Sequence, residues 1–459
     1  MIDLAKDVAM SIDQLHQAFC RQALSPVTVL EALLEEIKAD THDINAFVLI
    51  DREAALEQAQ AAERRFINGT PIGVLDGIPV SVKDMIAVKG WPIRFGSCAT
   101  GHDPVCARDA PSVAGLRAAG AVVFGKTTTT EFGWTIMSGN PHTGVTRNPA
   151  NTLYSAGGSS SGAAAHVAKG WGPLALGSDA GGSVRIPAAL CGVVGFKPSY
   201  GAIPSPPLSA FADFAHQGVL TRTVADAQVA FSVLSKGHYS DPSSLFQRSF
   251  ESQPGRYLRI GWCDRIDADD VIDASVDGRF QEVLGQLRDR GYWLEQVDLK
   301  TAGYARAIWA VWVARVFESF QSWPEEKRCL LDPVLGRVYH EGAEIDSASV
   351  SVGRAALRDF HNRLNGVFGV YDLLLTPTTS APASRLPGSH EPEPAQLNWF
   401  ASNSFAFPFN QSHQPGISMP AGTSPDGLPI GLQIVGRKYA DQQVLSFSTE
   451  IEPLLKRFT

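Results

Sequence analysis

The stretch from Ala156 to Gly201 constrains this chain most, because it holds two serines that each follow a pair of glycines. Ser159 follows Gly157-Gly158, and Ser183 follows Gly181-Gly182. Glycine lets a backbone approach a ligand closely and adopt conformations that other residues avoid. Two such turns in one short stretch predict a site built from backbone amides and hydroxyl groups.

The same stretch resembles the signature of the amidase signature family. It has Gly-Gly-Ser-Ser at residues 157–160, Asp-x-Gly-Gly-Ser at 179–183 and Cys-Gly-x-x-Gly-x-Lys-Pro at 191–198. Agreement over a continuous stretch of this length is far more specific than a single glycine motif. The resemblance implies one domain over residues 1–459. Its signature core would cover about residues 70–200 and 372–437, with a variable insert at about 205–370.

Composition limits the partners of this chain. Its 459 residues are 44% hydrophobic and 19% charged, which is typical of a soluble globular protein with an ample core. The formal net charge is −8, and no run of Lys or Arg stands out. Nucleic acids and anionic membranes are therefore not expected as partners.

The N-terminus and the cysteines indicate the compartment. Asp3 and Asp7 lie where a signal peptide would need an apolar run, and no stretch is long and apolar enough to cross a membrane. The six cysteines are scattered without a Cys-x-x-Cys pair, as expected for free thiols in a reducing compartment. We therefore expect a cytoplasmic protein. Homodimers are common in the family, so a homodimer is a possible assembly.

Apolar runs of strand type alternate with helical patterns along the chain. The strands are expected at residues 78–82, 121–125, 174–177, 371–377 and 430–436, with helices at 112–119, 160–169, 275–290, 305–320 and 441–456. This alternation predicts an α/β fold with a mixed, largely parallel central sheet, flanked by helices on both faces.

Lys83 ends the first of these strands. On its own it would be assigned to the surface, as most lysines are. However, Gly77 to Asp84 resembles the Gly-[Ile/Val]-Pro-x-x-x-Lys-Asp segment of the family, whose lysine is the catalytic base. Burial lowers the pKa of an ammonium group, and only a neutral lysine accepts a proton.

The resemblance implies a relay of two serines and one lysine. Ser183 would attack the carbonyl carbon of an amide and pass its proton through Ser159 to Lys83. Most serine hydrolases use histidine for this task, but only His166 lies between the two serines in this sequence. Each serine alone would also suit a helix N-cap. The three residues together favour catalysis.

Further residues are expected to support the relay. The backbone N–H groups of Ala180, Gly181, Gly182 and Ser183 would form an oxyanion hole. The resemblance also implies a cis peptide bond before Ser159. Ser160, Ser161 and Asp179 are expected to orient the relay through hydrogen bonds, and Arg185 fits a supporting role better than a substrate contact.

Substrate-binding residues are harder to identify from the sequence. In the family, the region of Trp134, Met137 and Ser138 borders the acyl pocket, although Trp134 and Met137 would fit a core equally well. Four further aromatic side chains are available to line an apolar pocket: Phe211, Phe214, Trp309 and Trp312. This composition favours aryl or alkyl amides over charged ones.

Three other interpretations remain open. Gly158 to Gly162 also fits Gly-x-Ser-x-Gly, the nucleophile elbow of α/β-hydrolases with Ser160 as nucleophile, but no strand is expected before it. Serine- and glycine-rich helix N-termini also bind phosphate groups, although the P-loop pattern is missing. The chain is also compatible with the A subunit of a glutamyl-tRNA(Gln)-type amidotransferase, which needs a partner subunit. No cofactor is implied, and no metal-ligand spacing is present.

Overall fold

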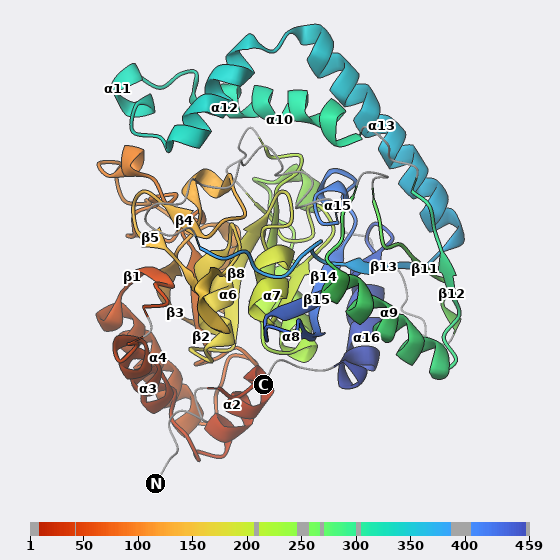
Figure 1. Ribbon diagram of the computed structural model, residues 1–459. Coiled ribbons are helices and arrows are strands. Elements are labelled where there is room, and N and C mark those ends of the chain that lie inside the picture. Colours follow the sequence, from red (N-terminus) through yellow and green to blue (C-terminus); the bar gives the residue numbers. More distant parts are fainter. Residues whose placement is uncertain are drawn as a thin grey trace.

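The computed structural model describes residues 9–41, 43–205, 211–245, 257–266, 270–299, 304–386 and 405–455. One large sheet crosses the molecule, with helices on both of its faces and a further group of helices across the ends of its strands (Figure 1). No helix in these ranges is both long and apolar enough to span a bilayer.

The central sheet has eleven strands. In spatial order they are β1 (Phe47–Ile50), β3 (Val122–Thr127), β2 (Pro79–Lys83), β8 (Leu174–Asp179), β10 (His216–Thr221), β9 (Val194–Lys197), β14 (Gly416–Thr423), β15 (Pro429–Gly436), β13 (Leu373–Pro377), β11 (Ile260–Trp262) and β12 (Leu294–Gln296). Two small hairpins lie outside it, β4 (Gly139–Asn140) with β5 (Gly144–Val145) and β6 (Arg147–Asn148) with β7 (Asn151–Ser155).

The predicted α/β fold with a mixed sheet is confirmed, but parallel pairs do not predominate. Six of the ten strand pairings are antiparallel. Alternation of strands and helices along a chain does not decide which strands become neighbours. For example, β8 and β10 pair antiparallel although α7 (Arg185–Cys191) and β9 lie between them in the sequence.

Alternating side chains give the sheet two buried faces. Leu174 and Leu176 of β8 join one core, whereas Ala175 between them joins another. The first core is covered by α2 (Ile12–Cys20), α5 (Pro111–Ala118), α8 (Val224–Leu234), α9 (Ala274–Asp289) and α16 (Asp441–Ile451). The other face is covered by α3 (Pro26–Lys38), α4 (Arg52–Ile67), α6 (Ser161–Ala168) and α7.

Four helices form the layer across the strand ends: α10 (Tyr304–Phe320), α11 (Glu325–Arg328), α12 (Pro333–Glu344) and α13 (Ser347–Val370) (Figure 1). We call them the helical layer. Helix α10 packs closely on α12, because Gly342 has no Cβ to collide with the carbonyl oxygen of Val313. Aromatic side chains of α10 join those of the strand-end loops in one apolar core.

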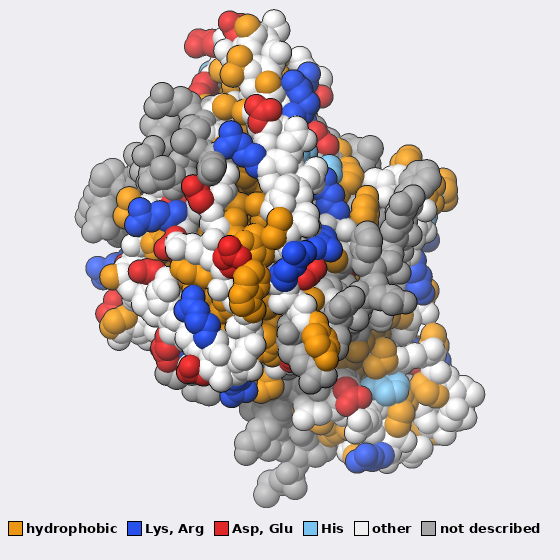
Figure 2. Space-filling view, turned by 90° about the vertical axis from the view of Figure 1, so that its right-hand side faces the viewer, with side chains coloured by type: hydrophobic (Ala, Val, Ile, Leu, Met, Phe, Trp, Pro, Cys, Tyr) orange, Lys and Arg blue, Asp and Glu red, His pale blue; other side chains and the backbone are white. Residues whose placement is uncertain are grey.

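The face at the right of Figure 1 includes α9, α13 and β12. On this face, Lys and Arg side chains are interspersed with Asp and Glu side chains, and hydrophobic side chains lie between them (Figure 2). A field of one sign, as a nucleic-acid-binding surface would need, is therefore not visible on this face.

Candidate active site

Lys83 lies at the end of β2, inside the protein. Val80 and Val82 point into one core, so Ser81 and Lys83 point to the opposite face, where α6 lies. The Lys83 side chain is 0% exposed, and its Nζ lies 2.7 Å from the Oγ of Ser159 and 3.3 Å from the carbonyl oxygen of Ser178. Burial lowers the pKa of Lys83 to about 7, although Asp179 opposes the shift. A substantial neutral fraction follows at neutral pH.

Ser159 lies in the loop between β7 and α6, and the peptide bond from Gly158 to Ser159 is cis, as the resemblance implies. Its side chain is covered by the loop of Thr130 to Trp134. A Cβ added to Gly133, whose φ is +71°, would lie 3.1 Å from the Ser159 Oγ and 3.1 Å from the Sδ of Met85. Ser159 is therefore enclosed, and is only 2% exposed.

Ser183 lies in the loop between β8 and α7, and this loop joins the segment of Ser159. The backbone N–H of Ser160 donates to the carbonyl oxygen of Ser183 over 3.1 Å. Ser183 is partly exposed, whereas Ser159 and Lys83 are buried. Of these three residues, Ser183 is therefore the most accessible to solvent.

The carboxylate of Asp179 shapes the loop before Ser183. It accepts hydrogen bonds from the backbone N–H of Gly182 over 2.7 Å and of Val184 over 3.2 Å. The Gly182 N–H is therefore engaged with this carboxylate, and the predicted oxyanion hole of Ala180, Gly181, Gly182 and Ser183 stays a prediction. In the described part of the chain, the N–H groups of Ala180, Gly181 and Ser183 have no acceptor.

Asp179 is itself held by Arg185, and both side chains are 0% exposed. The Arg185 Nε lies 3.0 Å and its Nη2 3.0 Å from the two carboxylate oxygens. Burial alone would raise the pKa of Asp179, but the guanidinium group overrides it and holds this pKa well below its usual range. Arg185 also donates from Nη2 to the Oδ1 of Asn410 over 2.6 Å and from Nη1 to the Oε1 of Gln433 over 2.8 Å. This geometry matches a supporting role for Arg185.

Asn410 and Gln433 were not identified from the sequence. Asn410 also donates to the Asp179 carboxylate over 2.8 Å, and Gln433 donates to the carbonyl oxygen of Phe405 over 2.7 Å. Both are buried. The sequence marks Gln433 only as the single polar side chain in the apolar run of residues 430–436, and it does not mark Asn410.

Ser160 and Ser161, which follow Ser159 in the sequence, are both buried. The Ser160 Oγ donates to the carbonyl oxygen of Ser178 over 3.2 Å, which Lys83 also contacts. The Ser161 hydroxyl has no hydrogen-bond partner among the described residues, so the structure provides no contact by which it would orient the relay. A strand does precede this segment, since β7 ends at Ser155, but it belongs to a hairpin and not to the central sheet. Ser160 is 0% exposed and thus poorly placed for a nucleophile elbow.

The three predicted substrate-binding residues differ in their surroundings. Trp134 is buried among the aromatic rings of α10, with its ring centre 6.2 Å from that of Trp309 and 6.5 Å from that of Trp312. Met137 is half-buried. Ser138 is buried, and its hydroxyl donates to the carbonyl oxygen of Thr146 over 2.5 Å. It therefore stabilises the loop in which it lies.

A group of aromatic rings around Trp312 adjoins the loops of Ser159 and Ser183 through neighbouring residues. On one side, Trp134 follows Gly133, which touches Ser159. On the other side, the Phe407 ring lies 5.2 Å from that of Trp312, and the preceding Ala406 packs on Gly182. Rings of Phe211 and Phe214 also contact Trp312. This group of buried rings therefore adjoins the segments of both Ser159 and Gly182 through single residues.

His166 has no role as a base in this geometry. Its Nδ1 lies 3.0 Å from the carbonyl oxygen of Trp171, so it donates there, and its Nε2 accepts from the Ser81 hydroxyl over 2.6 Å. Burial lowers the pKa of His166 to about 4, and the side chain is 0% exposed. It is a neutral core histidine.

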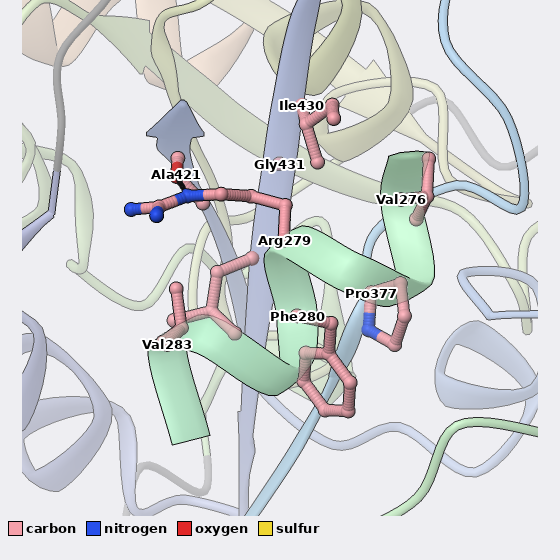
Figure 3. A pocket seen from close by; sticks show the side chains of 9 residues that line it. Val276, Arg279, Phe280, Val283, Pro377, Ala421, Ile430 and Gly431 are labelled. Carbon is pink, nitrogen blue, oxygen red and sulfur yellow. Dashed lines mark hydrogen bonds between the residues drawn. The ribbon is translucent and has the colours of Figure 1, made fainter. Parts of the chain in front are cut away.

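A small cavity lies far from this group, on the opposite face of the sheet. It is enclosed between α9 and strands β14 and β15, and measures about 10 Å³, which suits a single water molecule. Arg279 extends from α9 along its wall to the carbonyl oxygen of Ala421 (Figure 3). No group of three or more His, Cys, Asp or Glu side chains in the described ranges is arranged to hold a metal ion.

The fold and the site define a class of enzymes with an α/β sheet, a buried lysine and two glycine loops that carry serines. The family model described as Amidase matches residues 28–445, and the chain belongs to the amidase signature family, hydrolases that act on C–N bonds.

Individual relatives cover almost the whole chain. An acylamidase of Rhodococcus erythropolis is 33% identical over 96% of this chain and 95% of its own length. The A subunit of a glutamyl-tRNA(Gln) amidotransferase from Symbiobacterium thermophilum is 30% identical, with 97% of each chain covered. The structure of a bacterial aryl acylamidase has a TM-score of 0.88 at 29% identity, covering 96% of each chain.

Proposed function

We propose that this protein hydrolyses the C–N bond of small linear carboxylic amides through an acyl-enzyme on Ser183. The observation that carries the proposal is the 2.7 Å contact between the buried Lys83 Nζ and the Ser159 Oγ. A lysine whose pKa is lowered to about 7 by burial accepts a proton at neutral pH, which an ordinary surface lysine does not.

In the first half of the reaction, the Ser183 Oγ bonds to the carbonyl carbon. Its proton passes to Ser159, which gives its own proton to neutral Lys83. The N–H groups of Ala180, Gly181 and Ser183 stabilise the negative charge on the carbonyl oxygen. The C–N bond then breaks, and the Lys83 ammonium group returns a proton through Ser159 to the leaving nitrogen.

In the second half, water attacks the acyl carbon and passes a proton along the same relay. The bond to the Ser183 Oγ breaks, and this oxygen recovers a proton from Lys83 through Ser159. The products are a carboxylic acid and ammonia or an amine. The free enzyme is regenerated with Lys83 neutral.

The acyl group of the substrate is proposed to be aryl or alkyl. Trp134 follows the glycine that touches Ser159, and Ala406 and Phe407 connect Gly182 to Trp312. The two names among the relatives, acylamidase and aryl acylamidase, fit this chemistry. Charged acyl groups would lose their hydration against these rings.

A panel of aliphatic, aromatic and amino-acid amides tests the proposal, with ammonia release measured for the wild type and Ser183→Ala. We expect turnover of benzamide-type and alkyl amides by the wild type and none by Ser183→Ala. Trp134→Leu should lower kcat/KM for aromatic amides about tenfold, while the value for acetamide changes little. Activity confined to a small charged amide would contradict the apolar acyl pocket.

A second candidate is the A subunit of a glutamyl-tRNA(Gln)-type amidotransferase, favoured by full-length relatives of that name at similar identity. In that role the same relay would release ammonia from glutamine inside a complex. Turnover of simple amides by the purified chain alone supports the first candidate. Glutamine hydrolysis that appears only after a partner protein is added supports the second.

A further inference from the structure

Glu131 is a buried carboxylate that the relay does not use. It begins the short helix η2 (Glu131–Gly133) and is only 4% exposed. Its Oε1 accepts a hydrogen bond from the Ser97 hydroxyl over 2.6 Å, and its Oε2 accepts one from the backbone N–H of Asp332 over 2.7 Å. Each carboxylate oxygen is therefore bonded to a different segment of the chain.

These two partners belong to separate parts of the fold. Ser97 lies between β2 and α5 and is the N-cap of the short helix η1 (Cys98–Thr100), where its hydroxyl oxygen accepts from the N–H of Ala99 over 3.1 Å. Asp332 is the N-cap of α12, where its side chain accepts from the N–H of Val334 over 2.8 Å. Glu131 thus connects the loop of Thr130 to Trp134 with the helical layer.

The loop of Thr130 to Trp134 has an unusual backbone conformation at two positions. Phe132 has a φ of +48° and Gly133 a φ of +71°, both in the left-handed region. For a bulky residue such as Phe132, this conformation is costly unless neighbouring groups enforce it. The Phe132 ring packs on Phe95 at 5.4 Å and on Phe320 of α10 at 4.9 Å.

The same loop covers the relay serine. The backbone N–H of Thr130 donates to the carbonyl oxygen of Ser159 over 3.4 Å, and Gly133 lies against the Ser159 Oγ. Trp134, the next residue, belongs to the group of rings of Trp134, Trp309, Trp312 and Phe407, which we call the aromatic wall. A displacement of this loop would therefore move both the residues that cover Ser159 and the ring of Trp134.

A carboxylate in this position costs stability. Burial raises the pKa of Glu131 to about 7, against the lowering effects of the Ser97 and Asp332 hydrogen bonds. The negative charge of Asp332 raises the pKa further, and it is the charged group that faces Glu131 from α12. On the Ser97 side the group that faces it is an uncharged hydroxyl, while Lys327 of α11 pairs with Asp103 at 3.0 Å. A costly buried charge near a site indicates a functional reason for it.

We propose that Glu131 is a positioning residue, which fastens the loop over Ser159 to the helical layer and so fixes the relay and the aromatic wall relative to each other. The inference rests on the proposed function. It assigns to the helical layer a share in catalysis although none of its residues belongs to the relay. Glu131 acts through the loop and touches neither Ser159 nor Lys83 in the hydrogen-bond network.

Glu131→Gln tests the proposal, with Glu326→Gln on the exposed surface of α11 as the matched control. An amide has one acceptor oxygen and no negative charge, so the two charge-assisted bonds of the carboxylate cannot both be kept, while the shape of the side chain remains. At pH 8.5 we expect at least a tenfold loss of kcat/KM for an aromatic amide in Glu131→Gln and wild-type kinetics in Glu326→Gln. The melting temperature of Glu131→Gln should equal or exceed that of the wild type, because the variant removes a buried charge.

The pH dependence of stability provides a second readout. The folded-state pKa of Glu131 is raised above its usual value of 4.5, so the protonated group contributes stability at low pH that is lost as the pH rises through about 7. This loss should be absent in Glu131→Gln. A parallel fall of activity and melting temperature in the variant at pH 8.5 would indicate a merely structural residue and overturn the proposal, as would unchanged kinetics.

Ser97→Ala gives an independent variant in case Glu131→Gln folds poorly. It removes the donor to Oε1, and we expect a smaller loss of kcat/KM in the same direction. Ser183→Ala is the variant that tests the proposed function separately from the role of Glu131. If Ser183→Ala is inactive while both other variants behave as the wild type, the proposed function stands and only the role of Glu131 is wrong.

Discussion

The Lys83 Nζ and the Ser159 Oγ are 2.7 Å apart in a region from which solvent is excluded. No carboxylate forms an ion pair with Lys83 in the described part of the chain, and burial is the main cause of its lowered pKa. The neighbouring Lys126 differs, because it pairs with Asp84 at 2.8 Å. The two buried lysines of adjacent strands therefore differ in their partners, a serine hydroxyl for Lys83 and a carboxylate for Lys126.

The first prediction concerns pH. Because only neutral Lys83 accepts a proton, kcat/KM should fall at least tenfold per pH unit just below a pKa of about 7, where protonation of Glu131 adds to the loss, and be independent of pH above this range. A pH profile measured with a neutral amide checks this. If activity instead fell only below a pKa of about 4, which is the pKa of His166, the result would point to histidine as the base.

The second prediction concerns the stability cost of Lys83. Its pKa in the folded protein is lowered from 10.5 to about 7, so the unfolded chain binds an extra proton between these values and stability rises with pH across this window. Lys83→Met should abolish turnover yet raise the free energy of unfolding at pH 7, by up to about 1.4 kcal/mol for each pH unit that separates the two pKa values. Denaturant unfolding measures it, and a less stable variant would contradict the assignment of a buried neutral amine.

The third prediction concerns the ion pair of Asp179 and Arg185. Asp179→Asn leaves a guanidinium group buried without its charged partner, and we expect a loss of about 3–5 kcal/mol together with the loss of activity. Arg52→Met is the matched control, because Arg52 pairs with Glu35 on the surface at 3.2 Å with about half of each side chain exposed. Its cost should stay below about 1 kcal/mol in urea unfolding. Equal losses in the two variants would mean that the buried network does not support the Ser183 loop.

The fourth prediction concerns Gly182, whose φ is +108°. A Cβ there would lie 2.5 Å from the Cδ1 of Ile186 and 2.6 Å from the Cβ of Ala406, so Gly182→Ala should displace the loop and lower kcat at least tenfold. Gly427→Ala is the control, with a φ of +78° but no atom within 4 Å of the added Cβ. It should change stability alone. Wild-type kcat in Gly182→Ala would show that the loop tolerates displacement.

The sequence allowed the family, the α/β class and the grouping of Lys83 with Ser159 to be predicted, because short motifs fix the local backbone. The share of parallel pairs was overestimated, since local patterns do not reveal which strands become neighbours. The hydrogen bond from the Gly182 N–H to the Asp179 carboxylate could also not be predicted from the sequence. Asn410 and Gln433 were missed, because each reaches Arg185 from more than two hundred positions away.

Other expectations stay predictions. The division into a signature core and an insert at about 205–370 is one of them, and residues 387–404 of the core lie outside the described ranges. The cytoplasmic location and the homodimer are two more. Size-exclusion chromatography with light scattering checks the last of these, with a mass near twice 49.2 kDa expected for a dimer.

The most direct test of the account is the mass of the covalent intermediate. The enzyme is mixed with a slowly hydrolysed aromatic amide or ester, quenched with acid and digested, and the peptides are examined by mass spectrometry. We predict that the added acyl mass maps to Ser183 in the wild type, and that Ser183→Ala and Lys83→Met carry none. An acyl group on Ser160 or Ser159, or on Ser183 at the wild-type rate in Lys83→Met, would contradict the relay.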